Sequence, residues 1–198
     1  MDYMKISMQD ANKWLKEHLT EKRYQHSLGT AECAKDLAQR FGLDTQKAYV
    51  AGLLHDCAKC YSDEELLNII DKYLNDVDND ERSNKKTLHA PGSYYIAKTV
   101  FGLEDSEMLS AIRWHTLGKM NMTDFEKIIF LADKIELRTR DDNYRKQITK
   151  DLYGENGLNK AILECYKETI ISLVQRDLKI CPITVEIYNN LEQTINVN

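Results

Sequence analysis

Apolar residues recur at helical spacing along most of this chain, and residues that cap helices stand before many of these segments. A clear case precedes Gly42, where the apolar or small residues are Leu28, Ala31, Ala34, Leu37, Ala38 and Phe41. A repeat of three and four positions predicts a helix with one buried face, and glycine readily ends such a helix. Two prolines and eight glycines in 198 residues also favour helices over a β fold with many turns. We therefore predict an all-α fold.

Further helices are expected where a cap precedes an apolar pattern. Residues 62–65 (Ser-Asp-Glu-Glu) and 123–126 (Thr-Asp-Phe-Glu) are capping boxes, and Asp44 and Asp105 are also suited to cap helices. Residues 75–86 are polar and charged, and we expect them to form a surface loop. The pattern predicts eight or more helices, over about 7–19, 20–41, 44–54, 62–74, 87–101, 105–115, 123–135, 158–174 and beyond 182.

Composition narrows the class of partner and the compartment. Charged residues make up 30% of the chain, and the net charge of −5 argues against broad affinity for nucleic acid. No signal-peptide-like start is evident, and no stretch reaches the ~18 apolar residues of a membrane span. Five cysteines, an odd number, suit reduced thiols better than a disulfide framework. We expect a cytoplasmic protein without nucleic-acid or membrane partners; a homodimer is left open.

One expected helix ends in a histidine and an aspartate, His55 and Asp56, that stand next to each other. Adjacent helical residues point about 100° apart, so this pair cannot act as two ligands on one helix face. It can hold a metal ion from two sides, with the carboxylate free to bridge to a second ion.

Other residues favour the same interpretation. Asp133 ends an apolar run, where burying an ionised carboxylate without a partner would be costly. A metal ion is a suitable partner, whereas a single histidine in a helix is more often structural. His18 lies among Lys and Glu and is expected to be exposed. The other four histidines lie at or near expected helix ends or in helices with apolar faces: His26, His55, His89 and His115.

The order of these residues resembles that of HD-domain metallophosphohydrolases. More narrowly, residues 23–29 (Arg-Tyr-Gln-His-Ser-Leu-Gly), 54–59 (Leu-His-Asp-Cys-Ala-Lys) and 126–136 resemble the bacterial YqeK family of symmetrical diadenosine-tetraphosphate hydrolases. The resemblance covers about 19–140. It implies a single HD domain over 1–198, with a metal-binding helical core at 19–140 and additional C-terminal helices over 141–198.

The resemblance implies a dinuclear metal site. One ion would be held by His26, His55, Asp56 and Asp133, and the other by His89 and His115 with Asp56 bridging. Iron is the family's usual metal, and imidazole with carboxylate ligation also suits Mn or Zn. Metal-activated water would attack an inner phosphorus of diadenosine tetraphosphate and release two ADP.

Further roles follow from the resemblance. Asp56 and Lys59 would be catalytic, and the substrate would be contacted by Arg23, Lys59, His89, Thr116 and Arg140. Leu117 stands where the family commonly has a second threonine, which leaves the role of Thr116 open. The family's proline and arginine after Glu136 are replaced by residues 137–140, and we prefer Arg140 over Arg138 as the phosphate contact.

Several alternatives stay open. Lys59 could be a solvated lysine, and Arg23 could pair with an acidic neighbour. Cys57 and Cys60 form a C-x-x-C, but without a second such motif we interpret them as small, partly buried thiols. The chain could act on another nucleotide, such as a nucleoside di- or monophosphate. It could instead be a metal-stabilised helical binding module without catalysis.

Overall fold

The computed structural model describes residues 3–196, which form eleven α-helices and one short 3-10 helix, η1, with no strand among them. The prediction of an all-α fold is confirmed. In chain order the elements are α1 (Met8–His18), α2 (Glu21–Phe41), α3 (Thr45–Leu54), η1 (Cys57–Cys60), α4 (Asp63–Tyr73), α5 (Asn79–Ser83), α6 (His89–Thr99), α7 (Ser106–Trp114), α8 (Asp124–Ile135), α9 (Asp142–Thr149), α10 (Gly157–Gln175) and α11 (Pro182–Asn196).

The predicted caps form at the helix ends. Ser62 and Thr123 each complete a capping box with the glutamate three residues later. Asp44 accepts hydrogen bonds from two backbone amides at the start of α3. Gly42 ends α2 with a φ of 70°, in the left-handed region that glycine adopts without steric penalty.

The prediction of a surface loop over 75–86 is wrong in its middle, where the chain forms α5. Asp78 caps this short helix by accepting from the Glu81 amide at 2.8 Å. Glu81 is buried, because its carboxylate accepts two hydrogen bonds from the guanidinium of Arg113 on α7, at 2.8 and 2.7 Å. The local composition is polar, so nothing in it identified a partner that lies 32 residues further along the chain.

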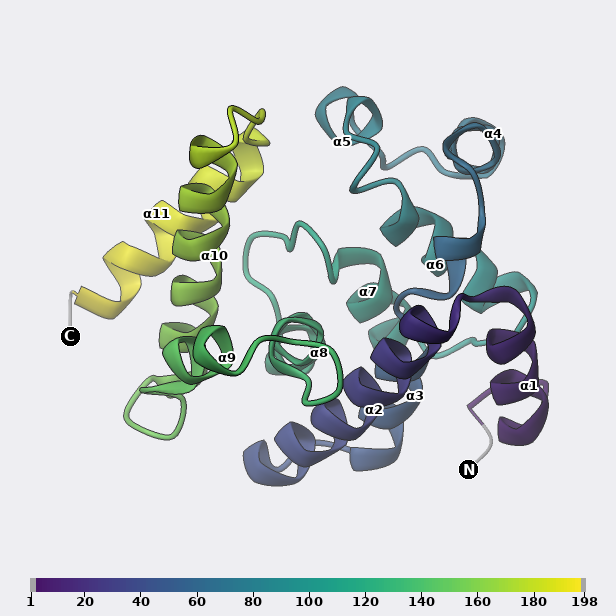
Figure 1. The fold of residues 1–198 in the computed structure, drawn as a ribbon, viewed down its shortest axis with the longest axis horizontal. Helices are drawn as coiled ribbons and strands as arrows, with labels where there is room; N and C mark the ends of the chain where they lie inside the picture. Colours follow the sequence, from purple (N-terminus) through teal and green to yellow (C-terminus); the bar gives the residue numbers. More distant parts are fainter. Residues whose placement is uncertain (1–2, 197–198) are drawn as a thin grey trace.

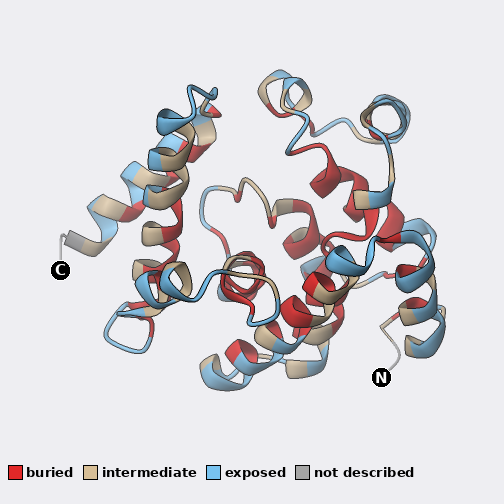
Figure 2. Ribbon diagram, viewed as in Figure 1, coloured by how far each residue is buried: buried red, intermediate tan, exposed pale blue. Residues whose placement is uncertain are grey.

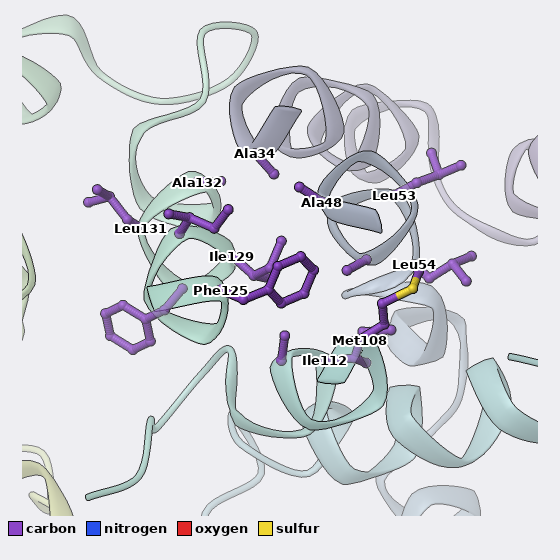
Figure 3. Packing of buried hydrophobic residues seen from close by; sticks show 14 of the residues in the cluster. Ala34, Ala48, Leu53, Leu54, Met108, Ile112, Phe125, Ile129, Leu131 and Ala132 are labelled. Atoms are coloured by element: carbon purple, nitrogen blue, oxygen red, sulfur yellow. The ribbon is translucent and has the colours of Figure 1, made fainter. Parts of the chain in front are cut away.

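Helix α8 lies at the centre of the arrangement, with α10 and α11 on one side and α1 on the other (Figure 1). Nine of its twelve residues are buried, which is why it is mostly red in Figure 2. Apolar side chains from α2, α3, α7 and α8 meet in one core; Figure 3 labels Ala34, Ala48, Ile112 and Ile129 among them. Within residues 3–196, no helix has both the length and the apolar character of a membrane span.

A close approach between α2 and α3 fixes the position of the residues that follow α3. A Cβ atom on Gly52 would lie 2.9 Å from both Ala31 Cα and the Thr30 carbonyl oxygen. Both are backbone atoms, so only glycine lets the two helices pack at this distance. The next turn of α3 leads directly to His55.

We predict that Gly52→Ala lowers the free energy of unfolding by about 2 kcal/mol, because α2 and α3 must separate to admit a methyl group. Urea unfolding of the metal-loaded protein, followed by circular dichroism, measures this. The control is Gly154→Ala, whose Cβ would lie 3.5 Å from its nearest neighbour, the Asp151 carbonyl oxygen. Equal effects of the two substitutions would contradict the close-approach argument.

Candidate metal centre

Six buried side chains from five helices converge beside the core. Each comes from the end of a helix or from one turn inside it, apart from His26, which lies in the second turn of α2. Apolar faces bring the helices together, and their polar side chains meet where the helix ends cross. The six are His26 from α2, His55 and Asp56 after α3, His89 from the start of α6, His115 after α7 and Asp133 from α8.

These side chains form two groups of potential metal ligands that share Asp56. The Nε2 atoms of His26 and His55 lie 3.3 Å apart, and those of His89 and His115 lie 3.1 Å apart. Asp56 Oδ2 faces the first pair at 3.9 and 3.8 Å, whereas Oδ1 faces the second pair at 3.3 and 3.4 Å. Within each group the ligand atoms lie within 4.8 Å of one another. One carboxylate thus lies between two imidazole pairs.

The hydrogen bonds on the far side of the rings show that this donor set fits metal ions. His55 Nδ1 lies 2.7 Å from the Gly52 carbonyl oxygen, and His115 Nδ1 lies 2.7 Å from that of Ile112. A carbonyl only accepts, so each Nδ1 carries a proton, and Nε2 is the nitrogen available as a metal ligand. These Nε2 atoms face other imidazole nitrogens and carboxylate oxygens. A cation between them resolves the repulsion.

The protonation states of His89, His115 and Asp56 suit metal ligation. Burial lowers the pKa of His89 well below its usual range and also lowers that of His115. Burial opposes ionisation of Asp56, but the neighbouring imidazoles outweigh it and hold the pKa of this carboxyl well below its usual range. Neutral imidazole and ionised carboxylate are the forms that bind a metal ion.

Asp133 lies against two cations as well as His26. Its Oδ1 accepts from Arg140 Nη2 at 2.6 Å and lies 2.9 Å from His26 Nε2, and its Oδ2 accepts from Lys134 Nζ at 2.5 Å. Burial opposes ionisation here too, but Lys134, His26, His55 and Arg140 keep the pKa of Asp133 well below its usual range. Asp133 is therefore a charged group at the same centre.

Three predicted substrate-binding residues lie beside this centre. Arg23 donates to Asp56 Oδ2 at 3.1 Å. Thr116 Oγ1 lies 3.0 Å from the Nε2 atoms of both His89 and His115. Arg140 reaches Asp133 and, at 3.3 Å, His26 Nε2. The pairing of Arg23 with an acidic group thus occurs, and a substrate contact by any of the three stays a prediction.

Unlike these three residues, the side chains of Lys59 and Arg138 form no hydrogen bond or ion pair with the six proposed ligands among the described residues. The Lys59 ammonium is half-buried and has no hydrogen-bond or ion-pair partner among residues 3–196, and burial lowers its pKa. Arg138 pairs instead with Glu32 at 2.6 Å and Gln25 at 2.5 Å, on the exposed side of α2. Arg138 and Arg140 were both candidates for the phosphate contact, and Arg140 is the one that contacts proposed ligands.

The HD-domain family model matches residues 23–138, more than half of the chain. The chain belongs to the HD-domain family. It is 42% identical to the symmetrical bis(5'-nucleosyl)-tetraphosphatase of Halalkalibacterium halodurans, over 89% of this chain and 92% of that one. The enzyme of the same name from Staphylococcus aureus is 36% identical, over 93% and 94%.

A solved HD-domain structure has the same fold. It is described as a "predicted HD superfamily hydrolase involved in NAD metabolism" from Clostridium acetobutylicum. Its TM-score is 0.87 at 33% sequence identity, and the match covers 96% of this chain and 98% of that one. The prediction of an HD-type helical fold is confirmed, and the proposed domain limits stay a prediction.

Glu136 was not predicted to belong to the site, yet its carboxylate lies 3.1 Å from His26 Nδ1. Glu136 falls three residues after Asp133, on the same side of α8, and that spacing was the available signal. The cysteines add no ligand to either group of three. All five are free, and Cys57 is buried with its Sγ 3.6 Å from the Ser93 carbonyl oxygen.

We predict that His55→Ala and Asp56→Ala each abolish metal binding and turnover, because each removes a buried ligand and leaves facing lone pairs without their cation. Metal content per chain, circular dichroism and nucleotide hydrolysis measure the outcome. Helix content is expected to survive. The matched control is His18→Ala, at an exposed ring that bonds to the Trp14 carbonyl oxygen and stacks on the Trp14 ring. Wild-type activity in either site variant would contradict the ligand assignment.

Proposed function

We propose that this chain is a metal-dependent phosphohydrolase that cleaves diadenosine tetraphosphate symmetrically into two ADP. One observation carries the proposal: two pairs of imidazoles share the carboxylate of Asp56, in a chain that belongs to the HD-domain family. Two relatives that match along nearly their whole length are named symmetrical bis(5'-nucleosyl)-tetraphosphatases. A hydrolase is favoured over a binding module, because the centre combines ligands with nearby cations.

The residues would divide the chemistry as follows. Bound metal ions supply Lewis-acid chemistry, which lowers the pKa of water and polarises a phosphoryl group. His26, His55, Asp56 and Asp133 would hold one ion, and Asp56 would reach the second ion beside His89 and His115. No serine or cysteine nucleophile is required.

Charge near the centre suits a polyphosphate chain. The half-buried Lys59 has lost part of its hydration without gaining an ion partner among residues 3–196, so a phosphate oxygen would be a favourable partner. The side chains of Arg23 and Arg140 are 45% and 35% exposed, so their guanidinium groups can reach a bound phosphate. Thr116 adds a hydroxyl beside His89. Together these groups would orient the phosphates and neutralise charge that develops at the leaving ADP.

Iron is the metal we propose, and Mn or Zn also suits the donor set. His89 is proposed both as a ligand and as a residue close to the substrate, because its Nε2 lies next to Thr116. A cytoplasmic location stays a prediction.

We predict that the iron-loaded protein, kept under reducing conditions, converts diadenosine tetraphosphate to ADP as its sole nucleotide product. In water enriched in oxygen-18, one of each two ADP molecules should carry the label on its β-phosphate, since water attacks an inner phosphorus. Chromatography and mass spectrometry measure both, with Asp56→Ala as the background. AMP and ATP would refute the position of cleavage. An absence of product from protein with two bound ions would refute the substrate.

We predict that Lys59→Ala lowers kcat about 100-fold while both metal ions stay bound, because a cation at the phosphate is lost without loss of a ligand. Steady-state kinetics and metal content measure the two effects. Lys16→Ala, at an exposed position of α1, is the control. Unchanged kinetics would contradict a catalytic role for Lys59 and favour the alternative that it is a solvated lysine.

A further inference from the structure

Glu136 is a carboxylate with no exposed surface, immediately after α8. It accepts from the backbone amides of Arg138 at 2.5 Å and Thr139 at 3.0 Å, and from the Thr139 hydroxyl. Its remaining partner is His26 Nδ1, at 3.1 Å. These donors fix the carboxylate in one orientation, with Oε1 toward the back of one imidazole.

Gly29 provides the space in which this carboxylate lies. It stands one turn after His26 on α2, and a Cβ atom there would overlap the Glu136 carboxylate and come within 3.2 Å of Arg138 Cγ. A side chain at position 29 would therefore push Glu136 away from the His26 ring. The Glu136 carboxylate after α8 thus occupies the space that a side chain at position 29 of α2 would fill.

The four histidines of the centre differ on their far sides. His55 and His115 bond to backbone carbonyls through Nδ1, and the buried Nδ1 of His89 has no partner in the part of the chain that the structure describes. Among the described residues, a carboxylate lies behind the ring of His26 alone of the four. A charged acceptor holds the ring in one tautomer, fixes its orientation and makes the opposite nitrogen a stronger ligand.

We infer that Glu136 is the positioning residue for His26, and that Gly29 is required for it. Through the Nδ1–H of His26, Glu136 holds Nε2 toward Asp133 and His55 and so strengthens metal retention on that side of Asp56. Glu136 itself contacts neither the metal position nor the substrate. The inference rests on the metal centre of the proposed function but not on any particular substrate.

The test is metal retention by Glu136→Gln and Gly29→Ala. Glutamine keeps the size of glutamate but carries no charge. Its NH2 group would also face a donor, either a backbone amide of Arg138 or Thr139 or the His26 Nδ1–H. Gly29→Ala keeps the carboxylate and displaces it. Each Mn²⁺-loaded protein is competed against a graded series of chelator, and the metal that remains per chain is counted. We expect both variants to lose one of the two ions at a 10- to 100-fold lower chelator concentration than the wild type.

The matched control is Glu126→Gln on the same helix. Glu126 is also a buried glutamate; it pairs with Lys119 at 2.6 Å and completes the capping box of α8, outside the group of ligands. We expect Glu126→Gln to lower thermal stability and to leave metal affinity unchanged. An equal loss of affinity in this variant would mean general destabilisation and would overturn the inference.

Two further outcomes are decisive. Wild-type retention in Glu136→Gln overturns the inference, whatever happens to its melting temperature; if that variant does not fold, Gly29→Ala alone decides in the same way. A wild-type protein that binds two ions and leaves diadenosine tetraphosphate intact would refute the proposed function only. The inference about His26 would stand, because its readout is metal retention.

Discussion

The carboxylate of Asp56 lies where buried helix ends meet, with one oxygen toward His26 and His55 and the other toward His89 and His115. Such a concentration of lone pairs and negative charge in an apolar interior is unfavourable in isolation. A cation on each side of Asp56 would make the same arrangement favourable. Apolar packing brings the ends of α3 and α7, the start of α6 and a buried turn of α8 to this point.

Gly52 lets α2, which carries His26, and α3, which leads to His55, approach closely. A glycine stands three residues from each of the four histidines, at positions 29, 52, 92 and 118. A Cβ on Gly52 would meet the backbone of α2, and one on Gly92 would lie 2.5 Å from Leu66 Cδ2. A Cβ on Gly118 would overlap the Tyr166 hydroxyl, which donates to the Leu117 carbonyl oxygen at 2.8 Å. Packing distance, and not only ligand identity, therefore shapes the centre.

Charge is distributed unevenly around this centre. The chain carries a net charge of −5, yet Arg23, Lys59, Lys134 and Arg140 gather around Asp56 and Asp133. Three of these cations are paired with the two carboxylates, and Lys59 is left without such a partner among the described residues. A polyanionic substrate would meet local positive charge on a protein that is acidic as a whole.

The sequence by itself determined the helices and the types of ligand. Apolar spacing and caps such as Asp44, Ser62 and Thr123 act over a few residues, so they can be identified without a fold. Two helices were not predicted: α5, where Glu81 is held by Arg113, a distant partner, and α9, which begins within a charged run. The order of His26, His55-Asp56, His89, His115 and Asp133 identified the centre only through a resemblance, since spacing along a chain does not bring residues together.

Tertiary structure alone decided that Asp56 divides its two oxygens between two imidazole pairs, that Arg140 and not Arg138 faces Asp133, and that Glu136 backs His26. Those outcomes depend on how α2, α3 and α8 pack, because the groups involved are separated by as many as 110 residues.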